Sequence, residues 1–207
     1  MILETVVVGP LQVNCYILAK EEGKPAIIID PGAEPDKIKK VLANRHLTAG
    51  LVVNTHGHFD HIGADDAFGV PVAVGKEDAF MLLDAAQNFS LGFASPVTVR
   101  GTIRKLHDGQ LIEIYGISLR VLHIPGHTPG GIALVLEATE PKICFSGDSL
   151  FYESIGRTDL GGDEGTLLDA VRNKILILPK NTLIYPGHGP STTVGHELRY
   201  NPFFNHQ

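Results

Sequence analysis

Short β-rich runs separated by turn sequences dominate the first half of the chain. The strands expected there cover residues 2–8, 13–18, 26–29, 51–54 and 70–74. Pro35 suits a first helical turn, and Ile38, Val41 and Leu42 then fall on one face, which predicts a helix ending near Arg45. A second helix is expected after the last of these strands, through Leu83.

The second half repeats this organisation. Residues 103–106, 111–114 and 117–124 alternate as antiparallel strands do, and further strands are expected at 132–136, 142–146 and 182–185. One helix face is marked by Leu167, Leu168, Val171 and Ile175. No linker divides residues 1–207, so we expect one α/β (α+β) domain with two mixed β-sheets packed together and helices outside.

Composition and charge exclude several classes of function. The chain has 207 residues, 43% of them apolar, and a net charge of −6, which disfavours a nucleic-acid binder. Its apolar runs are too short to span a membrane, and no secretory signal is visible, so a cytoplasmic protein with a small-molecule partner is expected. Phosphate-binding loops and the G-x-S-x-G motif of serine hydrolases are absent from the sequence.

The clearest chemical signal is the segment THGHFDHIG, residues 55–63. In an extended segment, residues two apart face the same side, so His56 and His58 can hold one ion. If a helix follows, Asp60 and His61 project from its first turn toward a second ion. Imidazole and carboxylate groups are ligands for zinc, iron and manganese, so the segment predicts a metal site.

Three later positions each place a possible ligand in a tight loop after a predicted strand. They are His127, Asp148 and His188. Together with the first segment they make seven candidate ligands without a cysteine, too many for one structural zinc. Two divalent ions about 3.5–4 Å apart fit this number better, and they would bring the pKa of a bridging water from 15.7 to near 7. We expect a hydrolytic site.

These motifs resemble those of the metallo-β-lactamase superfamily over essentially the whole chain. The segments around His127, Arg157 and His188, with the closing NPFF of residues 201–204, are similar to the glyoxalase II (hydroxyacylglutathione hydrolase) group. The resemblance implies an αββα sandwich. It also implies that His56, His58 and His127 hold the first ion, that Asp60, His61 and His188 hold the second, and that Asp148 bridges them.

The resemblance further implies a zinc-dependent thioesterase, with iron or manganese as alternative metals. A hydroxide bridging the ions would attack the carbonyl of a thioester such as S-lactoylglutathione, oriented by Asp60 or Asp148. Long glyoxalase II enzymes continue into a helical domain that supplies much of the glutathione pocket, whereas this chain resembles the short branch. The thiol carrier therefore stays open, as does the choice between a monomer and a small homo-oligomer.

Four other residues each have two interpretations. Arg157 is either a clamp for a substrate carboxylate or an ion-pair partner of Asp159. Phe59 either walls the substrate pocket or packs in the core, and Tyr152 either lines the substrate site or is buried. Asp30 either holds the histidine loop from behind the ligands or is an ordinary turn carboxylate.

Two rival functions remain at this point. One is a persulfide dioxygenase with a single iron, and the other is a non-catalytic metal-binding protein on the same fold.

Both cysteines, Cys15 and Cys144, lie in apolar stretches and are expected to be buried. Residues 87–96 have no clear period and are expected to form a loop near the site. The histidines expected to be structural are His46, His107, His123, His196 and His206.

Overall fold

The first six strands pair in sequence order into one mixed sheet in the computed structural model, which describes residues 1–93 and 95–205. They are β1 (Ile2–Val8), β2 (Val13–Ala19), β3 (Pro25–Ile29), β4 (Thr48–Asn54), β5 (Val72–Gly75) and β6 (Ile103–Leu106). β1, β2 and β3 are antiparallel neighbours, whereas β3 to β6 run parallel. The parallel crossovers contain α1 (Pro35–Asn44), α2 (Phe59–Ile62), η1 (Asp65–Phe68), η2 (Lys76–Asp78), η3 (Met81–Leu83) and α3 (Ser90–Phe93).

The second sheet has the order β14-β13-β10-β9-β8-β7. Its strands are β7 (Leu111–Ile114), β8 (Ile117–His123), β9 (Ile132–Leu136), β10 (Ile143–Gly147), β13 (Leu183–Pro186) and β14 (Thr192–Thr193). A small hairpin, β11 (Leu150–Phe151) and β12 (Ser154–Ile155), lies beside it. The remaining helical segments are α4 (Glu164–Ala170), continued by the π-helical turn η4 (Val171–Ile175), and α5 (Val194–Tyr200).

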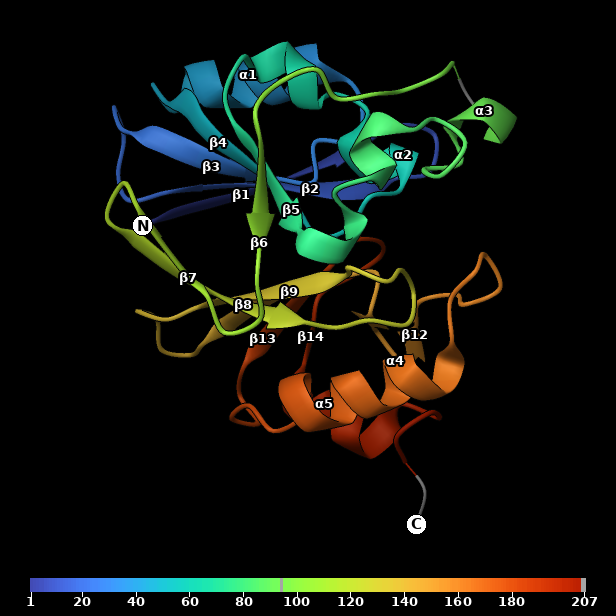
Figure 1. The fold of residues 1–207 in the computed structure, drawn as a ribbon. Helices are drawn as coiled ribbons and strands as arrows, with labels where there is room; N and C mark the ends of the chain where they lie inside the picture. The colour runs from blue at the N-terminus through green and yellow to red at the C-terminus, as the bar shows by residue number, and fades with distance from the viewer. Residues whose placement is uncertain (94, 206–207) are drawn as a thin grey trace.

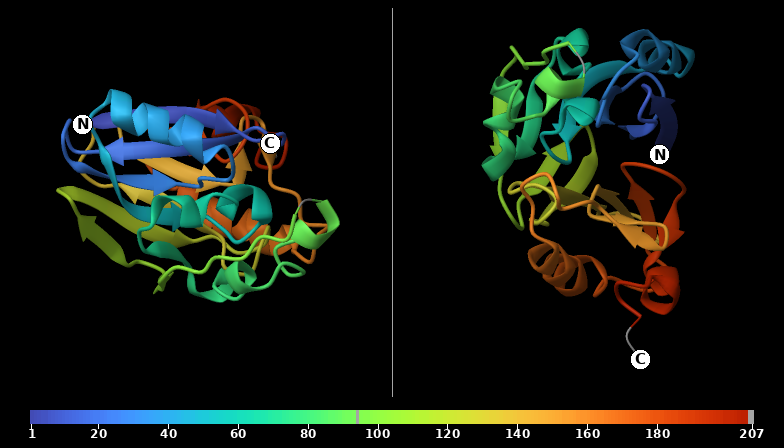
Figure 2. Two further views of the ribbon diagram at one scale, coloured as in Figure 1. Left: turned by 90° about the horizontal axis from the view of Figure 1, so that it is seen from above. Right: turned by 90° about the vertical axis from the view of Figure 1, so that its right-hand side faces the viewer.

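The two sheets face each other as the middle layers of a four-layer sandwich. In Figure 1, α1 covers the outer side of the N-terminal sheet, whereas α4 and α5 cover the outer side of the C-terminal sheet. The right-hand view of Figure 2 shows the two halves of the chain as separate layers with helices outside. The predicted αββα sandwich of two mixed sheets is therefore confirmed.

The alternation in β2 explains how one strand contributes to two cores. Cys15 and Ile17 pack in the cluster between the first sheet and α1, whereas Tyr16 and Leu18 pack in the cluster between the two sheets. Successive side chains of a strand point to opposite faces of the sheet, so a continuous apolar run supplies apolar side chains to both faces. A third cluster joins the second sheet to α4 and η4 through residues such as Leu167 and Val171.

Two local predictions are wrong. The segment after β5 forms the short 3-10 turns η2 and η3 and not an α-helix, because Phe80 and Leu83 are exposed and offer no continuous buried face. β6 is not an antiparallel neighbour of β7; it pairs parallel with β5 in the first sheet. By contrast, β7 and β8 are antiparallel as expected.

Both cysteines are buried free thiols, as predicted. Among the described residues, no helix has the length and apolar character needed to cross a membrane. His206 lies outside the described residues.

Candidate metal centre

Four loops bring the seven candidate ligands to one edge of the sandwich. β4 leads into the segment with His56 and His58, and α2 then carries Asp60 and His61. The other ligands follow β8, β10 and β13. Because β8 and β10 are both antiparallel to β9, and β13 is parallel to β10, these three strands end at the same edge. Strand direction therefore gathers ligands that are far apart in the sequence.

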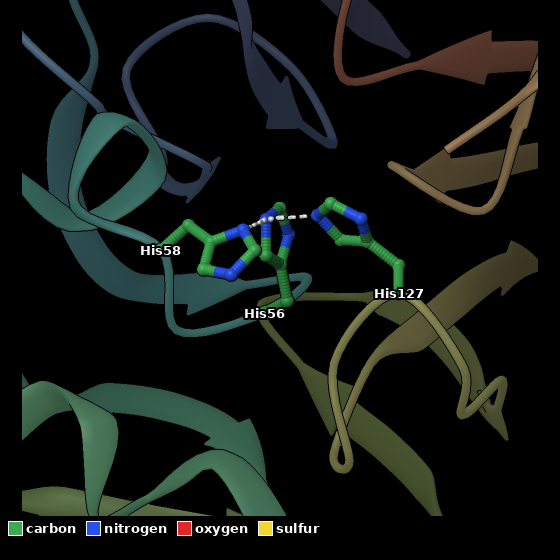
Figure 3. A group of neighbouring side chains, drawn as sticks. All are labelled: His56, His58 and His127. Atoms are coloured by element: carbon green, nitrogen blue, oxygen red, sulfur yellow. Dashed lines mark hydrogen bonds between the residues drawn. The ribbon is translucent and has the colours of Figure 1, made fainter. Parts of the chain in front are cut away.

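The first ligand group is formed by three histidines, drawn in Figure 3. His56 Nε2 lies 3.1 Å from His58 Nδ1 and 3.3 Å from His127 Nε2. The three side chains are buried and come from the loop after β4 and from the loop after β8, so the group joins the two sheets. Three nitrogens converging on one space form the type of site that binds a divalent metal.

Two further groups adjoin the first. One contains His56, His61 and Asp148, and the other contains Asp60, His61 and His188. Asp148 Oδ1 lies 3.4 Å from His61 Nε2, and Asp148 Oδ2 lies 3.5 Å from His188 Nε2 and 3.7 Å from His127 Nε2. One carboxylate therefore faces ligands of all three groups.

The electrostatics of the cluster set the charge of each ligand. Burial lowers the pKa of His58 to about 3, and the nearby His127 adds to the effect, so the imidazole is neutral. Burial opposes ionisation of Asp148, but His61 and His188 hold its pKa well below the usual value. Burial also opposes protonation of His61, yet Asp148 and Asp60 raise the pKa of His61 well above its ordinary value. Binding of a metal ion through this imidazole would therefore release a proton.

Three of the histidines have their second ring nitrogen fixed by a neighbour. His127 Nδ1 donates to the carbonyl of Arg157 at 2.6 Å, and His188 Nδ1 donates to the carbonyl of Leu11 at 2.9 Å. His56 Nδ1 lies 3.1 Å from Thr55 Oγ1. Such contacts fix the tautomer and the ring orientation, so that Nε2 of each ring faces the shared space.

Asp30 lies directly behind the ligand loop. Its carboxylate accepts the Thr55 N–H and the Thr55 hydroxyl, both at 2.7 Å, and its Oδ2 is 3.1 Å from His61 Nδ1. This buried contact brings the Asp30 carboxylate close to the His61 imidazole, but its geometry is not that of a hydrogen bond. The structure thus favours the interpretation that Asp30 supports the histidine loop over that of an ordinary turn carboxylate.

Asp78 is a supporting residue that the sequence did not indicate. Its Oδ2 accepts the Gly57 N–H at 3.0 Å, and its Oδ1 accepts the Gly130 N–H at 2.5 Å. These two glycines lie in the loops that carry the ligands of the first group. A single aspartate after a short strand carries no sequence signal for this role, because both partners are backbone groups distant in the chain.

The donor set fits divalent metal ions. Among the described side chains, His61 Nε2 and Asp148 Oδ1 are buried polar atoms without a hydrogen bond, although they lie 3.4 Å apart. Buried polar groups normally have partners, and a cation between these atoms would supply one. Imidazole nitrogens with carboxylate oxygens are the ligands that zinc, iron and manganese accept. The chain therefore contains a metal-binding His/Asp cluster.

The ligands open into a hollow of about 550 Å³, which we call the site cavity. His58, Asp60, His127, Asp148 and His188 face it. Its apolar wall consists of Leu11, Phe59, Phe89, Phe151, Ile155 and Leu160. Phe59 is therefore a wall residue. Phe89 was not singled out from the sequence, although it lies in the segment expected near the site; its ring packs edge-on against that of His58 at 5.3 Å.

Arg157 and Tyr152 differ in their relation to the cavity. Arg157 lines it but makes two hydrogen bonds to Asp159, at 2.6 and 2.7 Å, so the ion-pair interpretation is the one observed. Tyr152 is not among the residues that line the site cavity. The residue is 44% exposed and its ring stacks on that of His196 at 4.8 Å, so the expectation of a buried tyrosine is wrong.

Known proteins resemble this chain in both sequence and structure. The family model described as the metallo-beta-lactamase superfamily matches residues 8–188. The chain is 36% identical to the hydroxyacylglutathione hydrolase GloC of Haemophilus influenzae, over 99% of both chains. The B3 metallo-beta-lactamase BLEG-1 superimposes with a TM-score of 0.91 at 37% identity, over 99% of this chain and 100% of that one.

The crystal structure of TTHA1623 in a di-iron-bound form also superimposes, with a TM-score of 0.82 at 37% identity. It covers 97% of this chain and 99% of that one. The family match, these identities and the His/Asp cluster at the sheet edge agree: the chain belongs to the metallo-beta-lactamase superfamily.

Proposed function

We propose that the protein is a thioester hydrolase that uses two divalent metal ions. The observation that carries the proposal is the position of Asp148, whose carboxylate lies 3.7 Å from His127 of one ligand group and 3.4 and 3.5 Å from His61 and His188 of the other. A carboxylate between two ligand groups suits a pair of ions better than a single ion. The similarity to GloC, named a hydroxyacylglutathione hydrolase, supports a thioester as the substrate.

In this proposal His56, His58 and His127 would hold one ion, Asp60, His61 and His188 would hold the other, and Asp148 would contribute its carboxylate to both. Zinc is the first expectation, with iron or manganese as alternatives. When bound, such ions polarise a carbonyl oxygen and make water acidic enough to attack near neutral pH.

The chain's own residues bind and orient the reactants. Phe59, Phe89 and Phe151 line the cavity beside the ligands, so a substrate packed against their rings would exclude water from this space. Asp60 and Asp148 are the two carboxylates that can orient the attacking water and accept its proton, since both face this cavity. A thiolate leaves without strong acid assistance, because a cysteine-like thiol has a pKa of about 8.5.

The experiment compares His58→Ala with His107→Ala after loading each protein with zinc, iron or manganese. We expect His58→Ala to lose metal and thioester hydrolysis together while keeping its circular dichroism spectrum. His107 is exposed and is not one of the clustered ligands, so His107→Ala controls for loss of a histidine. The substrates are thioesters of glutathione and of smaller thiols, with metal content measured on the same sample.

The outcomes separate the rival functions. Two metals per chain with thioester hydrolysis support the proposal. One iron per chain with oxygen uptake on a persulfide would instead identify a dioxygenase, and bound metal without turnover would identify a non-catalytic protein. Full hydrolysis by His58→Ala would contradict the metal-dependent mechanism.

A further inference from the structure

A second hollow adjoins the site cavity. It has a volume of about 480 Å³, and we call it the hairpin hollow because the turn between β1 and β2 forms one wall. Its apolar lining includes Val8, Pro10, Val13, Ala33 and Val97. Leu11, Phe59 and Asp60 line both hollows. Asp60 is a candidate ligand, so this second space begins directly beside the metal centre.

The charges around the two hollows disfavour a carrier with several carboxylates. Among the described residues that line them, Arg157 is the one lysine or arginine, and it is paired with Asp159. Besides Asp60, the charged residue lining the hairpin hollow is Glu34, which pairs with Lys37 at 3.7 Å, so this lining supplies no cation for an anionic group. An uncharged, apolar group is therefore the occupant that this hollow accommodates best.

Leu11 is the residue that the two hollows share at the tip of the hairpin. Its side chain is 51% exposed, although it lies beside a buried metal-binding cluster. Its carbonyl accepts a hydrogen bond from His188, and Glu34 Oε2 accepts the Gly9 N–H at 2.8 Å, so the hairpin is fixed at both positions. A fixed and half-exposed leucine at the entrance to an apolar hollow would be covered by a bound apolar group.

We propose that the preferred substrates are thioesters with an uncharged aliphatic acyl group, and that this group lies in the hairpin hollow against Leu11. This proposal rests on the thioesterase function proposed above. The polar thiol carrier then lies in the site cavity, where Ser154 and Arg157 supply polar atoms. Hydrolysis adds water to the carbonyl carbon and breaks the C–S bond, giving a carboxylic acid and a thiol without any oxidant.

The test is a chain-length series on one uncharged thiol: acetyl, butanoyl and hexanoyl thioesters of N-acetylcysteamine. Burying one methylene group strengthens binding about fourfold. We therefore expect kcat/KM to rise about fourfold for each methylene added to the acyl chain, until the hollow is filled. Leu11→Asn keeps the carbonyl that contacts His188 but replaces the apolar side chain. We expect it to reduce the ratio of hexanoyl to acetyl kcat/KM at least tenfold. Ile177→Asn is the control, because Ile177 is exposed and lines neither hollow.

A binding measurement distinguishes failure of the inference from failure of the proposed function. Ketone analogues with a methylene in place of the sulfur cannot be cleaved, and calorimetry with the metal-loaded protein gives their affinities. Equal hydrolysis of all chain lengths would overturn the inference and leave the thioesterase function intact. If no thioester were hydrolysed, the proposed function would fall. The affinities of the analogues would then test whether the hairpin hollow binds the acyl group. The inference is contradicted if affinity does not increase with chain length, or if Leu11→Asn leaves that increase unchanged.

Discussion

The carboxylate of Asp78 accepts the backbone N–H of Gly57, between two ligand histidines, at 3.0 Å. Its other oxygen accepts the N–H of Gly130 in the loop that carries His127. A Cβ on Gly57 would lie 2.6 Å from Met81 Cβ, so the close approach also requires glycine there. One buried side chain from η2 thereby links the two loops, from opposite sheets, that form the first ligand group.

Asp78→Asn is expected to weaken metal binding and kcat/KM by about 10- to 100-fold, as substitution of groups behind metal ligands commonly does. An amide can accept at one position only, so one of the two backbone N–H groups loses its partner. Metal titration with a competing chelator measures the first effect, and steady-state kinetics measure the second. Asp84→Asn is the matched control, because Asp84 is exposed and, among the described residues, its side chain accepts a local N–H, that of Ala86. Wild-type metal affinity in Asp78→Asn would contradict the linking role.

The hydroxyl of Thr55 joins Asp30 to His56, and its removal is expected to disturb the first ligand group. Thr55→Val preserves the side-chain shape but leaves a buried carboxylate oxygen without its donor, which costs about 1–3 kcal/mol of stability. Thr55→Ser retains the hydroxyl and should retain metal binding. Thermal unfolding and metal content, measured for both variants, test this. Equal behaviour of the two variants would show that the hydroxyl has no part in holding His56.

A methyl group at Gly187 is expected to disrupt the centre directly. Its Cβ would lie 2.1 Å from Asp148 Oδ1 and 2.8 Å from His61 Cε1. Gly187→Ala should therefore lose most bound metal and activity. Gly165→Ala is the matched control, because its Cβ would be no closer than 3.6 Å to its nearest neighbour, and alanine stabilises a helix by about 0.5–1 kcal/mol over glycine. Metal content should fall in Gly187→Ala and stay unchanged in Gly165→Ala, whose melting temperature should rise slightly.

The two thiols are expected to resist alkylation in the folded protein. Burial raises the pKa of Cys144 to about 12, and burial with the charge of Asp30 raises the pKa of Cys15 well above its usual value. Since the thiolate is the reactive form, a raised pKa means little reaction at pH 8. Mass spectrometry after iodoacetamide treatment should show no adduct on the native chain and two after unfolding in denaturant. Labelling of either thiol in the native protein at the rate of the unfolded chain would be inconsistent with this burial.

Local sequence patterns were sufficient to predict much of the architecture. The continuous β-rich runs of β2 and β3, bounded by turn residues, specified strands that bury both faces, and the apolar spacing of α1 specified a helix with one buried face. The HxHxDH segment likewise indicated His56, His58, Asp60 and His61 as neighbours. These features depend on periods of two or 3.6 residues, which a short stretch of sequence expresses by itself.

The remaining features required distant segments to meet. His188 Nδ1 reaches the carbonyl of Leu11 across 177 positions, and Asp78 binds backbone groups 21 and 52 positions away. The turns η2 and η3, the parallel placement of β6 and the exposed Tyr152 also departed from local expectation. The sequence alone determined which residues were suited to strands, helices and metal ligands, because those properties are local. The tertiary structure decided which carboxylates support the ligands and which apolar side chains shape the hollows, because those contacts depend on the relative positions of two sheets.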